Sequence, residues 1–195
     1  MHKREFSTLG YTIIKRFLPS AVVEENYHYA LSMAEKGNLD DGQVPGSPSF
    51  YQDKNMVDLQ KDYLPKISEK IGVKLKNVFT YHRVYRTGAI LRAHKDSERA
   101  EISATINMGQ QGKLWALWLL DMDERATVVR LEPGDALVYK GSQLMHWRER
   151  LLEADNVVQV MFHCVDAKGK HARVPLYEVT RKIRKKCREW CGIAY

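Results

Sequence analysis

The hydrophobic pattern of this chain changes its period near residue 78, from helical spacing to an alternation of two. Turns rich in Gly, Pro, Asp and Gln then separate a series of short apolar segments. The segments expected to form strands are 79–85, 91–96, 101–108, 113–120, 126–131, 136–140, 145–148 and 157–165. Short strands with such spacing are typical of sandwiches, barrels and jelly rolls, so the sequence predicts a mainly β core.

The part of the chain before this core is expected to be helical. Residues 20–36 carry apolar side chains at helical spacing, and residues 59–71 repeat the pattern with an interruption expected near Pro65. A strand is expected at 11–18, before the first helix. Residues 38–55 are rich in Gly, Pro and Asp without periodicity, which predicts a long loop that acts as a lid or binding segment. The expected class is α+β, mainly β with flanking helices.

We expect one domain over residues 1–175, with a helical N-terminal part at 19–72 and a β core at 78–166. A basic segment with helical spacing follows at 176–195. The net charge of +7 comes from this end, because residues 167–195 contain nine Lys and Arg but two Asp and Glu. A basic run can bind a nucleic acid backbone, although a solvated helix face is the simpler interpretation.

Cysteine usage and hydrophobicity point to a cellular setting. Three cysteines in 195 residues are a sparse and odd-numbered set, which argues against a disulfide framework and favours a reducing compartment. No segment approaches the ~20 consecutive apolar residues of a membrane span. The N-terminus also lacks the apolar region of a secretory signal. We therefore expect a cytoplasmic protein without membrane association.

His94 and Asp96 are the first candidate metal ligands. One residue separates them in an expected strand, where side chains at positions i and i+2 point to the same face. One imidazole and one carboxylate are two ligands of the facial triad that binds Fe(II), and His146 on a later strand is the candidate for the third. A His-x-Asp pair is common by chance and a lone histidine often has a core or surface role. Their combination with a β pattern favours a metal site.

Two segments carry a resemblance to a known family. Residues 81–96 hold a tyrosine, a glycine and the His-x-Asp pair, and residues 133–149 hold a Pro-Gly-Asp turn followed by His146. With a first strand that ends in Phe-Leu-Pro at 17–19, this pattern resembles the Fe(II)/2-oxoglutarate-dependent dioxygenase superfamily. It is most similar to the prolyl-hydroxylase-like branch, in particular to uncharacterised bacterial and phage members. The resemblance covers roughly residues 11–166.

The resemblance implies a double-stranded β-helix, or jelly roll, in which His94, Asp96 and His146 bind Fe(II). It also implies that 2-oxoglutarate and O2 are co-substrates, that succinate and CO2 are co-products, and that a peptidyl or small-molecule substrate is hydroxylated. Halogenase relatives replace the carboxylate ligand with a small residue. The presence of Asp96 therefore favours hydroxylation.

The chain departs from the family at the cation that pairs with the far carboxylate of 2-oxoglutarate. The family usually places Arg or Lys where this chain has Asn156, and residues 151–160 contain no basic residue. A buried carboxylate without a cation is costly, so another cation must serve or the co-substrate differs. Arg148 is the first candidate, because it lies two residues from His146 and should share its face of the strand.

Three further residues are candidates for contacts with the co-substrate. Lys113, at the start of an expected central strand, is the second candidate for the cation. Tyr85 and Ser103 are expected to offer hydroxyl contacts. For these three, as for Arg148, an ordinary surface or core role is the alternative.

Two other functions fit parts of the sequence. A nucleic-acid-modifying oxygenase of the same superfamily would use residues 176–195 to hold its substrate. However, the chain lacks the paired arginines that follow the distal histidine in demethylases of alkylated bases. A non-catalytic jelly-roll binding module is the other alternative, and the intact set of His94, Asp96 and His146 argues against it.

Overall fold

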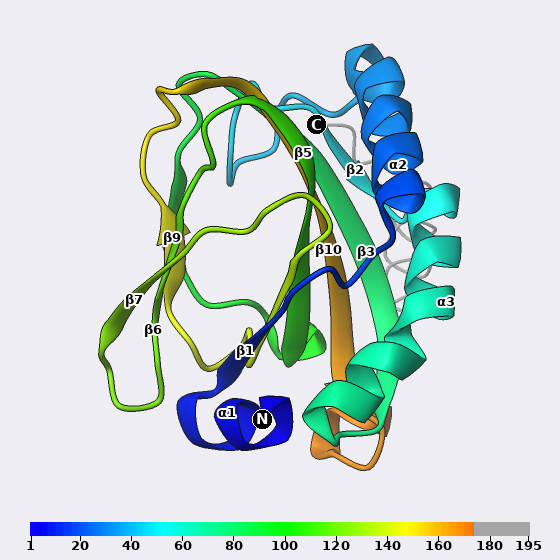
Figure 1. The fold of residues 1–195 in the computed structure, drawn as a ribbon, viewed down its shortest axis with the longest axis vertical. Helices are drawn as coiled ribbons and strands as arrows, with labels where there is room; N and C mark the ends of the chain where they lie inside the picture. Colours follow the sequence, from blue (N-terminus) through cyan, green and yellow to red (C-terminus); the bar gives the residue numbers. More distant parts are fainter. Residues whose placement is uncertain (174–195) are drawn as a thin grey trace, which may run out of the picture.

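A computed structural model describes residues 1–173, and the basic segment predicted at 176–195 lies outside them. Two antiparallel sheets face each other, with strand orders β1-β8-β5-β10-β3-β2 and β4-β9-β6-β7 (Figure 1). The larger sheet contains β1 (Tyr11–Ile14), β2 (Ser49–Tyr51), β3 (Leu75–Arg86), β5 (Ile102–Gly112), β8 (Ala136–Tyr139) and β10 (Ala154–Asp166). The smaller sheet contains β4 (Leu91–His94), β6 (Leu117–Leu120), β7 (Ala126–Val129) and β9 (His146–Arg148). This topology is a jelly roll, which confirms the predicted fold class.

The larger sheet has one apolar face and one face that carries many polar groups. On β10, Val158, Val160 and Phe162 are fully buried in the core that this sheet forms with the helices. The neighbouring Met161 and His163 point the opposite way and line a cavity. This alternation follows from the pleat of the strand, which places successive side chains on opposite faces. The apolar face is thereby used for packing, and the opposite face is left for a ligand.

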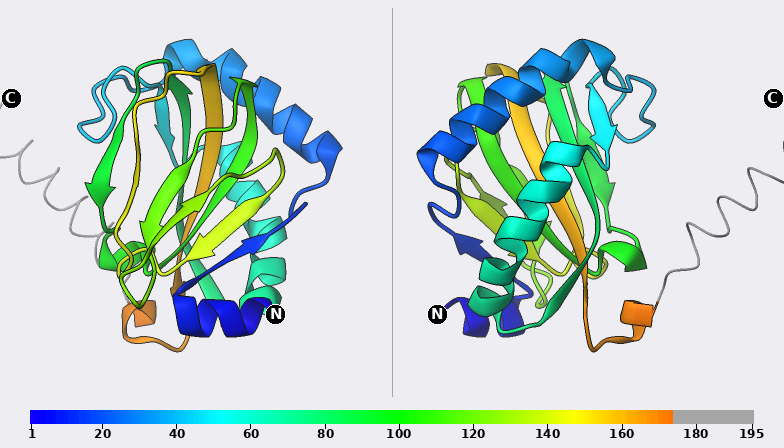
Figure 2. Two further views of the ribbon diagram at one scale, coloured as in Figure 1. Left: turned by 60° about the vertical axis from the view of Figure 1, so that its left-hand side comes forward. Right: turned by 90° about the vertical axis from the view of Figure 1, so that its right-hand side faces the viewer.

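Two helices cover the apolar face of the larger sheet (Figure 2). They are α2 (Ser20–Met33) and α3 (Lys54–Ile71). Helix α3 begins after Asp53, whose side chain accepts hydrogen bonds from the backbone N–H groups of Asn55 and Met56. Such a cap satisfies donors that have no partner within the helix. The two helices thus pack on the outer face of the jelly roll and support the larger sheet from outside.

Several boundaries differ from the expectations. Helix α3 is continuous through Pro65, so the predicted interruption is wrong; the buried Ile67 holds this part of the helix against the sheet. The first strand ends at Ile14 rather than at residue 18, because Arg16 has a φ of 48° that is incompatible with an extended strand. The predicted strand 113–120 begins only at Leu117.

Two short elements were outside the expectations. Helix α1 (His2–Leu9) packs at one end of the molecule, with Phe6 as its buried residue. Strand β2 lies inside the predicted loop 38–55 and pairs with the edge of β3 through Ser49, Phe50 and Tyr51. The loop is therefore attached to the sheet next to the cavity.

Apolar side chains also fill part of the space between the two sheets. Leu119, Leu137 and Leu151 are almost completely buried there, and Tyr85 and Tyr139 belong to the same cluster. The remaining space is the cavity that Met161 and His163 line. A packed apolar region of this kind keeps the strands that carry the candidate ligands in a fixed arrangement.

Two further features concern membrane-spanning helices and the reactivity of a cysteine. Among residues 1–173, no helix combines the length and the apolar character needed to cross a membrane. Cys164 is buried and free, and burial raises the pKa of its thiol to about 12. A thiol with so high a pKa has little thiolate and is a poor nucleophile.

Candidate active site

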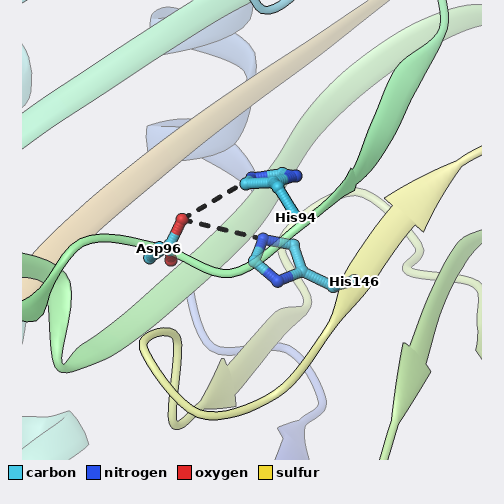
Figure 3. A group of neighbouring side chains, drawn as sticks. All are labelled: His94, Asp96 and His146. Atoms are coloured by element: carbon cyan, nitrogen blue, oxygen red, sulfur yellow. Dashed lines mark ion pairs between the residues drawn. The ribbon is translucent and has the colours of Figure 1, made fainter.

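Three side chains from the smaller sheet and its adjoining turn meet at one point. Strands β4 and β9 pair with His94 opposite His146, and Asp96 follows β4 by two residues. Asp96 Oδ1 lies 3.7 Å from Nε2 of each histidine, and the three candidate ligand atoms lie within 4.8 Å of one another (Figure 3). The structure thus brings the three predicted residues together, in the two-imidazole, one-carboxylate set that suits Fe(II).

Backbone carbonyls orient both imidazoles. His94 Nδ1 lies 2.8 Å from the carbonyl oxygen of Arg92, and His146 Nδ1 lies 3.1 Å from that of Leu144. Each Nδ1–H can therefore donate to a carbonyl, which leaves Nε2 with a lone pair on the side of Asp96. Burial lowers the pKa of His146, so the neutral form that a metal requires is favoured.

The Asp96 carboxylate is also fixed by its neighbours. Ser103 Oγ donates to Oδ2 over 2.6 Å, and the Asp96 backbone N–H donates to the carbonyl oxygen of Gly141 over 2.9 Å. His163 Nδ1 lies 2.9 Å from Ser103 Oγ, and burial lowers the pKa of His163 to about 4, so this ring is neutral at pH 7. His163 therefore orients Ser103, while Oδ1 of Asp96 is left to bind an ion.

A cavity of about 290 Å³ opens onto the three candidate ligands. Its size is at the lower end of the range for small-molecule sites. Both sheets contribute side chains to its wall, which mixes apolar groups with hydroxyl groups and one guanidinium. Residues in this wall besides the candidate ligands include Tyr85, Leu91, Thr105, Leu117, Tyr139 and Arg148.

Arg148 is the cation of this cavity. Its side chain comes from β9, two residues after His146, and it is 3% exposed. One guanidinium nitrogen donates to the carbonyl oxygen of Trp115 over 2.6 Å, and another donates to Gln159 Oε1 over 3.3 Å. The guanidinium carbon also lies 4.9 Å from the centre of the Trp115 ring. These contacts hold the guanidinium in one orientation inside the cavity.

Within residues 1–173, no carboxylate forms an ion pair with Arg148. Burial lowers the pKa of Arg148, but a guanidinium stays charged at neutral pH. A buried cation without a counterion is costly, and a carboxylate that enters the cavity would supply one through two parallel hydrogen bonds. The donor set of the cavity thus fits both a divalent ion and a small organic acid.

The other predicted contact residues have different positions. Tyr85 lines the cavity, with its ring edge-on to Trp115 at 4.9 Å. Ser103 acts behind Asp96 and is absent from the cavity wall. The side chain of Lys113 is 75% exposed and forms an ion pair with Glu153, so the structure does not bring Lys113 to the cavity.

Asn156, at the position where the resemblance predicted a cation, is not among the residues that line the cavity. Its Oδ1 accepts a hydrogen bond from the Tyr27 hydroxyl over 3.0 Å, and its Nδ2 donates to Gln111 Oε1 over 2.7 Å. An amide is well suited to bridge a donor and an acceptor in this way. Asn156 therefore links β10 to α2 and β5, and the guanidinium in the cavity wall belongs to Arg148 on β9.

Gln159, which supports Arg148, was not among the predicted site residues. Gln159 Oε1 accepts hydrogen bonds from Arg148 and from Thr105 Oγ1, and Gln159 Nε2 donates to Asn107 Oδ1 over 3.1 Å. This network of hydrogen bonds fixes the orientation of the Arg148 guanidinium. The signal in the sequence was a single glutamine inside the apolar run 157–160.

A second missed residue comes from the loop before β2. Gln43 Nε2 lies 2.9 Å from His94 Nε2, and Gln43 Oε1 accepts a hydrogen bond from Arg83 over 3.4 Å. The loop residue thus contacts the histidine nitrogen that faces Asp96. Only the expectation that 38–55 forms a lid or binding segment pointed toward it.

No protein-family model and no curated protein matches the sequence. Solved structures match the fold. A prolyl-4-hydroxylase from Pseudomonas putida is 16% identical, with a TM-score of 0.67 over 83% of this chain and 96% of that chain. HygX from Streptomyces hygroscopicus, with nickel, 2-oxoglutarate and hygromycin B bound, is 14% identical, with a TM-score of 0.66 over 89% of this chain and 93% of that chain.

A third similar structure is a prolyl hydroxylase from Trichoplax adhaerens in complex with a peptide fragment of hypoxia inducible factor. It is 15% identical, with a TM-score of 0.65 over 89% of this chain and 91% of that chain. At these identities the similarity concerns the fold. The chain therefore has the jelly-roll fold that is found in these oxygenases, over nearly their whole length.

Proposed function

We propose that this protein is an Fe(II)- and 2-oxoglutarate-dependent dioxygenase that hydroxylates a peptidyl or small-molecule substrate. The observation that carries the proposal is the presence, in one cavity, of a facial His-Asp-His set and an unpaired buried arginine. A divalent ion and a dicarboxylate satisfy these two features together. The similar folds of oxygenases, one of them with nickel and 2-oxoglutarate bound, support it.

The residues of the chain divide the work between metal and co-substrate. His94, Asp96 and His146 would hold Fe(II), which supplies the chemistry that couples oxidative decarboxylation of 2-oxoglutarate to hydroxylation. Arg148 would pair with the far carboxylate of 2-oxoglutarate. Ser103 fixes the orientation of Asp96 through its 2.6 Å hydrogen bond.

Tyr85, Thr105 and Leu117 would complete the wall around the co-substrate, since all three line the same cavity as Arg148. Apolar and hydroxyl groups around the acid exclude water, and this strengthens the pairing between its carboxylate and the guanidinium. If 2-oxoglutarate lies between Arg148 and the metal-binding side chains, the Gln43 side of the cavity is left for the primary substrate.

An activity assay tests this proposal through the release of succinate without added substrate. Purified protein is supplied with Fe(II), ascorbate, 2-oxoglutarate and air, and succinate is measured by mass spectrometry. We expect slow release by the wild type and none by His94→Ala or Asp96→Ala. Glu98→Ala is the matched control, because Glu98 lies two residues from Asp96 with its side chain 76% exposed, and it should keep wild-type turnover.

Circular dichroism of each variant separates loss of the site from loss of the fold. Equal succinate release by the wild type and by the folded His94→Ala and Asp96→Ala variants would remove the metal assignment. Metal binding without any turnover would favour the non-catalytic binding module. The nucleic-acid alternative depends on residues 176–195, which lie outside the described residues.

A further inference from the structure

A second hollow adjoins the cavity that holds the candidate ligands. It has a volume of about 510 Å³ and lies between the loop 42–47 and the segment 86–92, which joins β3 to β4. Gln43 lines both hollows, so they meet at the side chain that contacts His94. We call the second hollow the arginine groove, after Arg86 and Arg92 in its wall.

The charge of the arginine groove is of one sign. Arg86 and Arg92 are both exposed, and neither forms an ion pair with a described residue. No carboxylate is among the residues that line the groove. Elsewhere on the described surface, Lys15, Lys54 and Lys113 each have a carboxylate partner. The groove therefore presents two free guanidinium groups to an incoming ligand.

The loop wall of the groove is held in place by a buried cluster. The Arg83 side chain is 1% exposed and forms an ion pair with Asp41, and the Tyr81 hydroxyl donates to the same carboxylate. The Tyr81 hydroxyl oxygen also lies 3.0 Å from Ser49 Oγ. Asp41 directly precedes the loop residues of the groove. A wall fixed in this way needs little ordering when a ligand binds.

The opposite wall is attached to the candidate metal centre. Arg92 lies on β4 two residues before His94, and its carbonyl oxygen accepts the hydrogen bond of His94 Nδ1. A β-bulge between Leu91 and His94 interrupts the alternation of β4, so the Arg92 side chain is exposed in the groove while His94 lines the cavity. A ligand that contacts the Arg92 guanidinium therefore lies in the same groove as Gln43, which contacts His94.

We propose, on the basis of the proposed oxygenase function, that the primary substrate carries an oxoanion, carboxylate or phosphate, which binds to Arg86 and Arg92 in the arginine groove. The carbon to be hydroxylated then lies at the Gln43 side of the adjoining cavity. Two guanidinium groups recognise an oxoanion through paired hydrogen bonds, and a fixed offset between groove and metal centre selects the position that is oxidised.

The test uses three fluorescein-labelled nonapeptides with a central proline. They differ at three flanking positions, which are all Glu in the first peptide, all phosphoserine in the second and all Gln in the third. Anisotropy is measured on the full chain with Mn(II) and 2-oxoglutarate under nitrogen. The groove variant is Arg86→Gln with Arg92→Gln. The control is Lys74→Gln with Arg130→Gln, which removes the same charge from exposed positions outside both hollows.

We expect the Glu or phosphoserine peptide to bind the wild type at least tenfold more tightly than the Gln peptide. The groove variant should lose this preference, and the control should keep it within twofold. The tighter of the two acidic peptides identifies carboxylate or phosphate as the anion. Equal affinity for all three peptides, or equal loss in groove and control variants, would overturn the proposal.

Binding of Mn(II) and 2-oxoglutarate to each variant is measured separately. If these ligands bind and the acidic peptides show no preference, the groove proposal is wrong and the proposed function stands. If Mn(II) and 2-oxoglutarate do not bind to the wild type, the proposed function itself is wrong.

Discussion

Gly141 lies so close to the candidate metal centre that any side chain at this position would obstruct it. A Cβ atom at this position would lie 2.6 Å from Ser103 Oγ and 2.7 Å from the carbonyl oxygen of Ala100, and would also overlap Asp96 Oδ2. Such distances are far below ordinary van der Waals contact, so the neighbours must move. The Asp96 carboxylate is thus oriented by a residue that has no functional group of its own.

We predict that Gly141→Ala weakens Mn(II) binding by roughly 10- to 100-fold, in the range for loss of groups that support metal ligands. Isothermal titration measures the affinity. Gly42→Ala is the control, because no atom lies within 4 Å of a Cβ at that position. Unchanged Mn(II) affinity in Gly141→Ala would show that the position of Asp96 is not critical.

Arg148 permits a test that separates co-substrate from metal. We predict that Arg148→Gln weakens 2-oxoglutarate binding by about 2 kcal/mol, the usual contribution of hydrogen bonds to a charged group, with Mn(II) affinity unchanged. Arg150→Gln, two residues along the chain and exposed, should bind 2-oxoglutarate as the wild type does. Wild-type affinity in Arg148→Gln would assign the carboxylate to another group.

At the level of elements, the alternation along β10 was predictable from the sequence, and the irregular positions were not. The period of two gave the strands, because Val158, Val160 and Phe162 share one face of the sheet. Pro65 inside α3 shows the limit of such rules. Local propensity argues for a break there, but packing of the helix on the sheet is worth more than the lost hydrogen bond.

Strand β3 also carries a buried histidine that limits stability in acid. His82 is fully buried, its ring stacks on Phe50 at 4.4 Å, and neither ring nitrogen has a hydrogen-bond partner among the described residues. Burial lowers its pKa from 6.5 to about 4. The folded state therefore binds this proton less readily than the unfolded state does, and stability is lost as the pH falls from 6.5 to 4.

We predict that this histidine alone lowers the free energy of unfolding by about 3 kcal/mol between pH 6.5 and 4. His82→Leu, which cannot be protonated, should flatten the dependence in this window. Urea denaturation at several pH values measures it. The slope will not vanish, because burial also lowers the pKa of His163 to about 4. An unchanged slope in His82→Leu would show that His82 does not control acid stability.

For the whole molecule, the sequence predicted the candidate ligands better than the groups around them. His94 ends β4 and Asp96 follows it by two residues, so their closeness is local in the chain. Gln43, Gln159 and Arg148 come from a loop and two different sheets, so their positions around the site depend on the closure of the jelly roll. Side chains from elements so far apart can be placed only once the strand order is known.

The jelly roll explains why metal and co-substrate should act on the stability of the entire fold. The candidate ligands join β4 to β9 in one sheet, and Arg148 is held by Gln159 from the other. A ligand that binds only the folded state stabilises it by mass action. Because both sheets contribute side chains to the site, bound metal and 2-oxoglutarate should stabilise the packing of one sheet on the other.

The measurement that tests the central claim most directly is titration of 2-oxoglutarate into the wild type under nitrogen, with and without one equivalent of Mn(II). We predict one Mn(II) site, 2-oxoglutarate binding that requires Mn(II), and loss of both in Asp96→Ala. Absence of 2-oxoglutarate binding to Mn(II)-loaded protein, or equal binding with and without the metal, would contradict the account.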